Sequence, residues 1–259
     1  MVSFLQPFST EVIKVKHSFA FWLTILCAVI VPIGLLLAFS YEWQLLIPHS
    51  GVSPWDDYFI RAFNGCAFTA PLFVLLINGL ILNIEHTSQG WKHIFTLPIS
   101  RGKIFLNKLL LVLTIIVGFF ILYFFLILIA GYFLGAYRSQ LKFLDYSPDW
   151  KYLFAFMIKS FISVLGVIAI QFWISFRMKN LIVSLGIGLL CFMIAISLTM
   201  PRIVWDNVIY YPYAASLLMI NHYEKTSGNF FETYHIASVV WFIFFSLLAY
   251  WDFTTKFER

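Results

Sequence analysis

The chain has 259 residues, of which 61% are hydrophobic, 20% aromatic and only 11% charged. Water-soluble domains carry about 25% charged residues and about half apolar ones, so the composition excludes a soluble globular protein and favours an integral membrane protein. The formal net charge of +5 fits a membrane protein whose basic residues meet anionic lipid headgroups, and it gives no reason to expect nucleic acid as a partner.

Residues 1–18 precede the first apolar run and show a helical pattern of their own. Their apolar residues recur at spacings of three and four, with charged residues on the opposite face. This pattern predicts an amphipathic helix on the inner membrane surface. The alternative is an ordinary cytoplasmic extension of the first span. The apolar face comprises Leu5, Phe8, Val12, Val15 and Phe19, and the polar face comprises Glu11, Lys14, Lys16 and His17.

Six apolar runs are long enough to cross a membrane. A hydrocarbon core of about 30 Å needs about 20 helical residues, and a helix satisfies its own backbone hydrogen bonds in lipid. We therefore predict an all-α polytopic fold that forms one transmembrane domain over residues 1–259. The third run exceeds one crossing, which predicts tilt or an extension towards Tyr137. The predicted spans are Phe19–Phe39, Phe59–Ile84, Ile104–Tyr137, Tyr152–Phe176, Leu181–Met200 and His235–Phe253.

Lys and Arg residues mark the cytoplasmic side of a membrane protein. Most of the 17 Lys and Arg residues flank one side of the predicted spans, and most of the 12 acids lie on the other side. An even number of spans then leaves both termini in the cytoplasm, for a multi-pass protein of the cell membrane. The cytoplasmic set comprises Lys14, Lys16, Lys92, Arg101, Lys103, Lys108, Arg177, Lys179, Lys256 and Arg259.

The segment 201–234, between the last two spans, differs from an ordinary outer loop. Its apolar piece Tyr210–Ile220 is too short to cross and contains Pro212. These features predict a re-entrant or interfacial element on the outer side. An aromatic belt of Trp205, Tyr210, Tyr211 and Tyr213 would hold it at the membrane surface.

The sequence contains no recognisable site for a metal or a nucleotide. The phosphate-binding pattern G-x-x-x-x-G-K-[ST] is missing, because Ile104 follows Gly102-Lys103 and Leu97 stands where the first glycine would be. We therefore expect no cofactor on this chain, no catalytic residue and no ATP hydrolysis by the chain alone. The six histidines show no i, i+4 pair, and the three cysteines lack metal-ligand spacing.

Two basic residues inside the spans are weak candidates for a cargo path. Charges within a membrane span are costly and therefore often functional. Arg61 stands four residues after Asp57, which predicts an ion pair near the outer surface, and Lys159 lies about two turns into the fourth span. A structural role is the alternative for both, with Lys159 extending its ammonium to the surface.

The segment 85–103 is a polar and basic interruption between the second and third spans. In it, Trp91, Ile94 and Phe95 form an i, i+3, i+4 apolar face that suits a groove on a soluble partner. Pro98 would stop that helix and Ser100 would cap the next one. The alternative places the aromatic rings in the headgroup layer. A further hypothesis is a salt bridge or capping contact between Glu85 and Arg101, at the two ends of the loop.

With Glu85 at the end of the second span and the run "GWKHIFTLPISRGKIFLNK" after it, the segment resembles the inner loop of ABC-2-type ABC transporter permeases, especially the small subunits of lantibiotic and bacitracin immunity systems. The six-span layout and the flanking elements resemble that family as well. The resemblance implies a coupling helix that docks on an ATPase. Its candidate docking residues here are Glu85, Trp91, Ile94, Phe95, Leu97, Pro98, Ser100 and Arg101, with Lys108 downstream.

The resemblance implies a permease subunit of an ABC exporter that moves a hydrophobic or amphipathic cargo, such as an antimicrobial peptide, a drug or a lipid-linked molecule. Its partners would be separate cytoplasmic ATPase subunits that carry ATP and Mg²⁺, a second permease chain (an identical copy or a paralogue) and membrane lipid. The alternatives are a lipid-modifying membrane enzyme, which would use the outer acids, and a non-transporting scaffold or sensor. The outer acids are Asp56, Asp57, Asp145, Asp149 and Asp206.

Overall fold

The computed structural model describes residues 15–16, 18–43, 53–87, 100–200, 205–221 and 230–255. Within these ranges the fold is helical, without strands, and six helices are long and apolar enough to cross a membrane. The all-α prediction with six spans is therefore confirmed. The helices are α2 (Phe19–Tyr41), α3 (Pro54–Thr87), α5 (Arg101–Tyr137), α6 (Trp150–Arg177), α7 (Leu181–Leu198) and α9 (Thr233–Thr255).

Two of the six helices are much longer than a membrane is thick. Helix α3 has 34 residues and α5 has 37, which correspond to about 51 and 56 Å at 1.5 Å per residue. A hydrocarbon core of about 30 Å cannot contain them unless they tilt or project beyond it. The third predicted run is therefore one helix that continues to Tyr137. Helix α3 begins at Pro54, five residues before the predicted Phe59.

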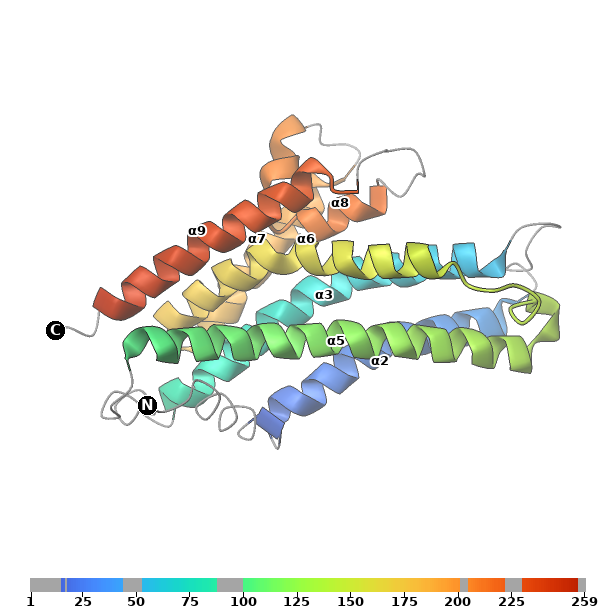
Figure 1. The fold of residues 1–259 in the computed structure, drawn as a ribbon, viewed down its shortest axis with the longest axis horizontal. Coiled ribbons are helices and arrows are strands. Elements are labelled where there is room, and N and C mark those ends of the chain that lie inside the picture. The colour runs from blue at the N-terminus through green and yellow to red at the C-terminus, as the bar shows by residue number, and fades with distance from the viewer. Residues whose placement is uncertain are drawn as a thin grey trace.

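Helix α3 lies at the centre of the bundle (Figure 1). It packs against α2 and α5 on one side and against α6 and α7 on the other, and α9 covers α6. The described ends of α3, α6 and α9 and the start of α5 all lie at the left of Figure 1. We call this the loop end, because residues 88–99 connect α3 to α5 there. The opposite end is the outer end of the predicted topology.

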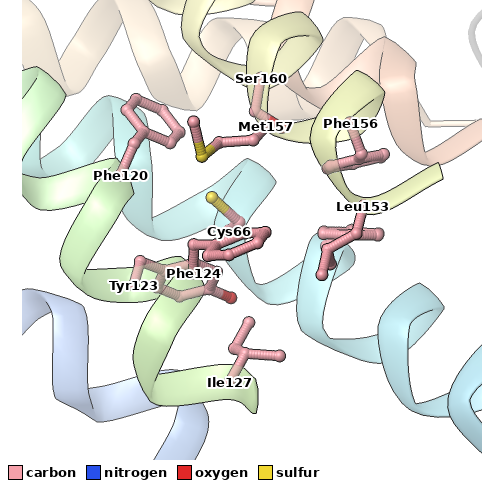
Figure 2. A pocket seen from close by; sticks show the side chains of 10 residues that line it. Cys66, Phe120, Tyr123, Phe124, Ile127, Leu153, Phe156, Met157 and Ser160 are labelled. Atoms are coloured by element: carbon pink, nitrogen blue, oxygen red, sulfur yellow. The ribbon is translucent and has the colours of Figure 1, made fainter. Parts of the chain in front are cut away.

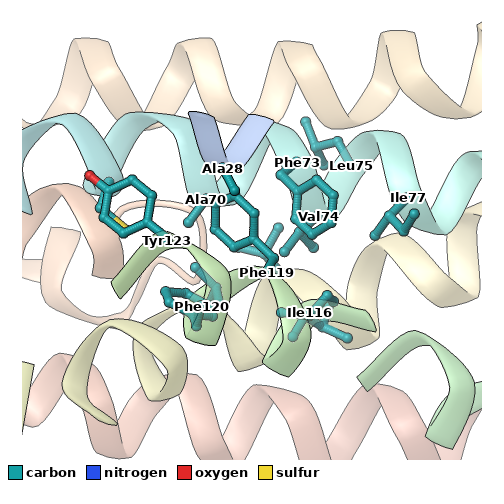
Figure 3. Packing of buried hydrophobic residues seen from close by; sticks show 14 of the residues in the cluster. Ala28, Ala70, Phe73, Val74, Leu75, Ile77, Ile116, Phe119, Phe120 and Tyr123 are labelled. Atoms are coloured by element: carbon teal, nitrogen blue, oxygen red, sulfur yellow. The ribbon is translucent and has the colours of Figure 1, made fainter. Parts of the chain in front are cut away.

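Aromatic stacking fills the middle of the bundle. Phe73 of α3 stacks on Phe119 of α5 with ring centroids 4.4 Å apart, and Figure 3 shows Ile116 and Val74 beside them. Ala28 of α2 and Ala70 of α3 are buried in the same cluster. In lipid, where helices gain little from excluding water, close packing through such small residues is what holds them together.

At the outer end, Trp55 joins the start of α3 to the loop after α5. Its indole N–H donates to the carbonyl oxygens of Phe143 and Tyr146, each at 3.0 Å. The ring lies against Gly131, where an added Cβ would be 2.5 Å from the indole. Only glycine leaves room for the indole at position 131. The two hydrogen bonds of Trp55 hold the loop, which includes the short 3₁₀ helix η2 (Ser139–Leu141), against the bundle.

The segment between α7 and α9 packs into the bundle. It contains the 3₁₀ helix η3 (Asp206–Tyr210) and helix α8 (Ala215–Asn221), and α8 contacts α3, α6 and α9. The Tyr211 hydroxyl donates to the carbonyl oxygen of Cys191 at 2.9 Å. Tyr213 is buried, which raises the pKa of its phenol, so it belongs to the core and not to a surface belt. Where the segment lies relative to a membrane stays a prediction.

Two predicted elements fall outside the described residues. Most of the amphipathic helix predicted for residues 1–18 lies in 1–14, and the docking face Trp91, Ile94 and Phe95 lies in 88–99 with Leu97 and Pro98. Both stay predictions. The structure does describe the two ends of the 85–103 segment, where it leaves α3 and where it enters α5.

Candidate functional site

A buried ion pair joins α3 to α5 beside the 88–99 loop, at a place that we call the base of the loop. The Lys108 ammonium, two turns into α5, lies 2.6 Å from a carboxylate oxygen of Glu85 in the last turns of α3, and their side chains are 5% and 3% exposed. Such a pair contributes little net stability, because both charges lose their hydration. Removing one partner is costly, since the other charge is then left buried alone. The pair therefore fixes how α3 and α5 lie against each other at the loop end.

Arg101 makes a different connection. Its guanidinium donates to the carbonyl oxygen of Thr254, near the end of α9, at 3.0 Å. Next to it, an added Cβ on Gly102 would lie 3.1 Å from the Tyr250 hydroxyl, so α5 and α9 touch closely. Glu85 and Arg101, which we considered as partners, thus have different described partners. At the two ends of the loop, Arg101 contacts α9 and Glu85 contacts α5.

Ser100 stands at the N-cap position of α5 with an extended backbone, as predicted, but its side chain makes no capping hydrogen bond. Its carbonyl oxygen accepts from the backbone N–H of Lys103 at 2.9 Å. The first turn of α5 therefore begins at Ser100 without a side-chain cap.

Two further contacts join the helices at the loop end. The Arg177 guanidinium of α6 lies 3.2 Å from the carboxylate of Asp252 in α9. A ring nitrogen of His86, in the last turn of α3, lies 3.3 Å from the carbonyl oxygen of Ser175 in α6. Together with the contacts of Lys108 and Arg101, they connect α3, α5, α6 and α9 around the base of the loop.

A polar cluster that the sequence did not indicate joins α6 to α7 nearby. The hydroxyls of Ser175 and Ser184 are 2.7 Å apart, and the side-chain amide of Gln171 donates to the carbonyl oxygen of Ser184 at 3.1 Å. An added Cβ on Gly188 would lie 2.5 Å from the Gln171 amide oxygen. Gln171 and Ser175 stand four residues apart on α6 and both contact Ser184 of α7, and their i, i+4 spacing was the signal available in the sequence.

A small cavity of about 20 Å³, with room for about one water molecule, lies among α3, α5 and α6 towards their outer halves (Figure 2). Small-molecule pockets have volumes of about 300–1,000 Å³, so this cavity is too small to hold a cargo molecule. Here the Tyr123 hydroxyl donates to the carbonyl oxygen of Ala62 at 2.5 Å, so the polar end of that wall is already satisfied. The lining of the cavity comprises Phe63, Cys66, Phe120, Tyr123, Phe124, Ile127, Leu153, Phe156, Met157 and Ser160.

The two basic residues considered for a cargo path have separate partners. Arg61 pairs with Asp57 at 2.9 Å, and both side chains are about half exposed, which confirms the predicted i, i+4 pair. Lys159 is half-buried and lies over the ring of Phe230, 5.1 Å from its centroid. Arg61 therefore has an ordinary surface partner, whereas Lys159 contacts only an aromatic face among the described residues.

A known protein family matches most of the chain. No curated protein matched the chain. The family model described as "ABC-2 family transporter protein" matches residues 8–196. This range includes the first five of the six membrane-spanning helices, apart from the last turn of α7, and the whole 85–103 segment. Since the match covers well over half of its residues, the chain belongs to the ABC-2 family of transporter proteins.

Proposed function

We propose that this ABC-2 permease subunit is the membrane half of an exporter for a hydrophobic or amphipathic cargo, driven by separate ATPase chains. The contacts around the base of the 88–99 loop carry the proposal. An ATPase that pushed on that loop would act on α3 and α5 through Glu85 and Lys108, and on α9 through Arg101. Domain motions of this kind need packed elements that move as units.

The cargo class rests on the walls of the bundle. The six spans are strongly apolar, and the two buried charges of α3 and α5, Glu85 and Lys108, pair with each other. Burying apolar cargo surface there needs no compensating hydrogen bonds. A hydrophobic or amphipathic molecule fits such walls better than a sugar or an amino acid. Immunity against a membrane-active peptide is one function consistent with the proposal.

The alternative of a lipid-modifying enzyme has less support, because two of its candidate acids have structural roles. Asp57 pairs with Arg61. Asp149 caps α6, since its carboxylate accepts from the backbone N–H of Tyr152 at 3.1 Å. Among the described residues, no group of three or more His, Cys, Asp and Glu side chains is placed to hold a metal.

The proposed orientation predicts which loops an impermeant thiol reagent can reach in intact cells. In a chain without its native cysteines, single cysteines replacing Ser88 and Lys179 should be protected, and those replacing Ser53, Ser147 and Ser227 should react, because basic loops stay in the cytoplasm. Labelling is measured by a mass shift on a gel, with lysed cells as the control. Labelling at Ser88 with protection at Ser53 would invert the topology.

Assembly tests the proposed function directly. Co-expression of this chain with the proteins encoded beside it, followed by native mass spectrometry, should give a complex with two permease chains and two ATPase chains. A matched sample with an unrelated ABC ATPase should give no complex. A permease that purifies alone under all these conditions would contradict the proposal and favour a scaffold or sensor.

A further inference from the structure

Lys159 of α6 and His235 of α9 lie at the same level near the outer end. Helices α6 and α9 run parallel, and one turn further along both, the Ser238 hydroxyl donates to the carbonyl oxygen of Ser163 at 3.0 Å. Lys159 precedes Ser163 by four residues and His235 precedes Ser238 by three, so each stands one turn outward of that contact. Two neighbouring rings link them, because the Lys159 ammonium lies 5.1 Å from the ring centroid of Phe230 and the ring centroids of Phe231 and His235 are 6.0 Å apart.

The imidazole of His235 presents a buried donor. The residue is 1% exposed, and its Nδ1 accepts from the backbone N–H of Glu232 at 3.2 Å. A neutral imidazole whose Nδ1 is an acceptor carries its proton on Nε2. Nε2 has no hydrogen-bond partner among the described residues. A buried donor without an acceptor is destabilising, so this position favours binding of a group that accepts a hydrogen bond.

The Lys159 ammonium adds a positive charge to the same place. Its described partner is the ring of Phe230, and no carboxylate lies within salt-bridge distance of it in the described part of the chain. A cation inside a membrane helix calls for a counter-charge. Glu232 contacts His235 through its backbone N–H, which donates to the imidazole.

We propose that Lys159 and His235 bind the phosphate group of an anionic amphiphile at the outer membrane surface. The ammonium and the Nε2–H would each donate to a phosphate oxygen, and such charge-assisted hydrogen bonds are about twice as strong as neutral ones. Phe230 and Phe231, which are 48% and 43% exposed, lie beside the two donors. Their rings offer an apolar surface to the chains of a lipid, which a free phosphate ion would not use.

The proposal does not depend on export, so it is tested on the purified permease in detergent without ATPase. Native mass spectrometry is used to titrate dioleoyl phosphatidylglycerol against dioleoyl phosphatidylcholine. The wild type should retain one phosphatidylglycerol in preference to phosphatidylcholine. Lys159→Gln should weaken that binding about tenfold, since a tenfold change corresponds to about 1.4 kcal/mol, and Lys159→Arg should keep most of it.

Lys151→Gln is the matched control, because Lys151 is an exposed cation two turns earlier on α6. It should bind like the wild type. His235→Gln should weaken binding as Lys159→Gln does, and melting temperatures of all variants show whether they fold. Equal loss in Lys151→Gln, or unchanged binding in a folded Lys159→Gln, would overturn the site. Displacement of the lipid by millimolar inorganic phosphate would overturn its assignment to an amphiphile.

Discussion

Replacing Lys108 by Met should lower the stability of the permease by about 3–5 kcal/mol, the usual cost of removing one partner of a buried ion pair. Glu85 is 3% exposed as a side chain and bonds to Lys108 at 2.6 Å. Met has nearly the length of Lys but no charge, so the change isolates the loss of the ammonium. Thermal unfolding of the detergent-solubilised protein would measure the effect as a lower apparent melting temperature.

The double variant Glu85→Met with Lys108→Met separates charge from packing. Because neither charge then remains buried, most of the lost stability should return. Arg61→Met is the matched control, since the Arg61–Asp57 pair is about half exposed and such pairs are worth about 0–1 kcal/mol. If the double variant melts as low as Lys108→Met, or if Arg61→Met costs as much, the buried charge is not what the loop end depends on.

Replacing Trp91 and Phe95 together by Ala should weaken ATPase binding by at least about 30-fold. Buried aromatic anchors at interfaces are often worth 2 kcal/mol or more each, and 1.4 kcal/mol corresponds to a factor of ten. Trp91 and Phe95 stand four residues apart in the segment that connects α3 to α5. The measurement is the amount of ATPase that co-purifies with tagged permease across a dilution series.

Trp150 and Phe154 offer a matched control for this variant. They have the same residue types and the same spacing, they are about half exposed, and they lie on α6 at the outer end. Their double replacement by Ala should leave ATPase binding unchanged. Full binding and full transport by the Trp91 and Phe95 variant would show that the segment is an ordinary loop at headgroup level.

The spans were predictable because each depends on local composition alone. A run of about 20 apolar residues has few alternatives to a membrane helix, and α7 begins at the predicted Leu181. Ends were less predictable where a helix continues past its apolar run. Helix α3 begins at Pro54 and includes Asp56 and Asp57. A hydropathy criterion leaves these two acids out of the span, but they can lie on a helix that projects beyond the membrane.

The contacts between helices were harder to predict. Arg101 and Lys108 stand seven residues apart, so both lie on the same face of α5. Lys108 is the residue that pairs with Glu85, because Glu85 lies at the level of Lys108 along α5. That level is set by how α3 and α5 pack, which the spacing of the residues does not determine. Lys159 and His235 are separated by 76 positions along the chain, and only the pairing of α6 with α9 brings them together.

ATP hydrolysis provides the most direct test of the central claim, that this chain is a permease driven by a separate ATPase. The purified chain should neither bind nor hydrolyse ATP, because its sequence has no phosphate-binding loop. The complex with its ATPase should hydrolyse ATP, and a substitution of the Walker lysine in the ATPase should abolish that activity. Hydrolysis by the purified single chain would contradict the account.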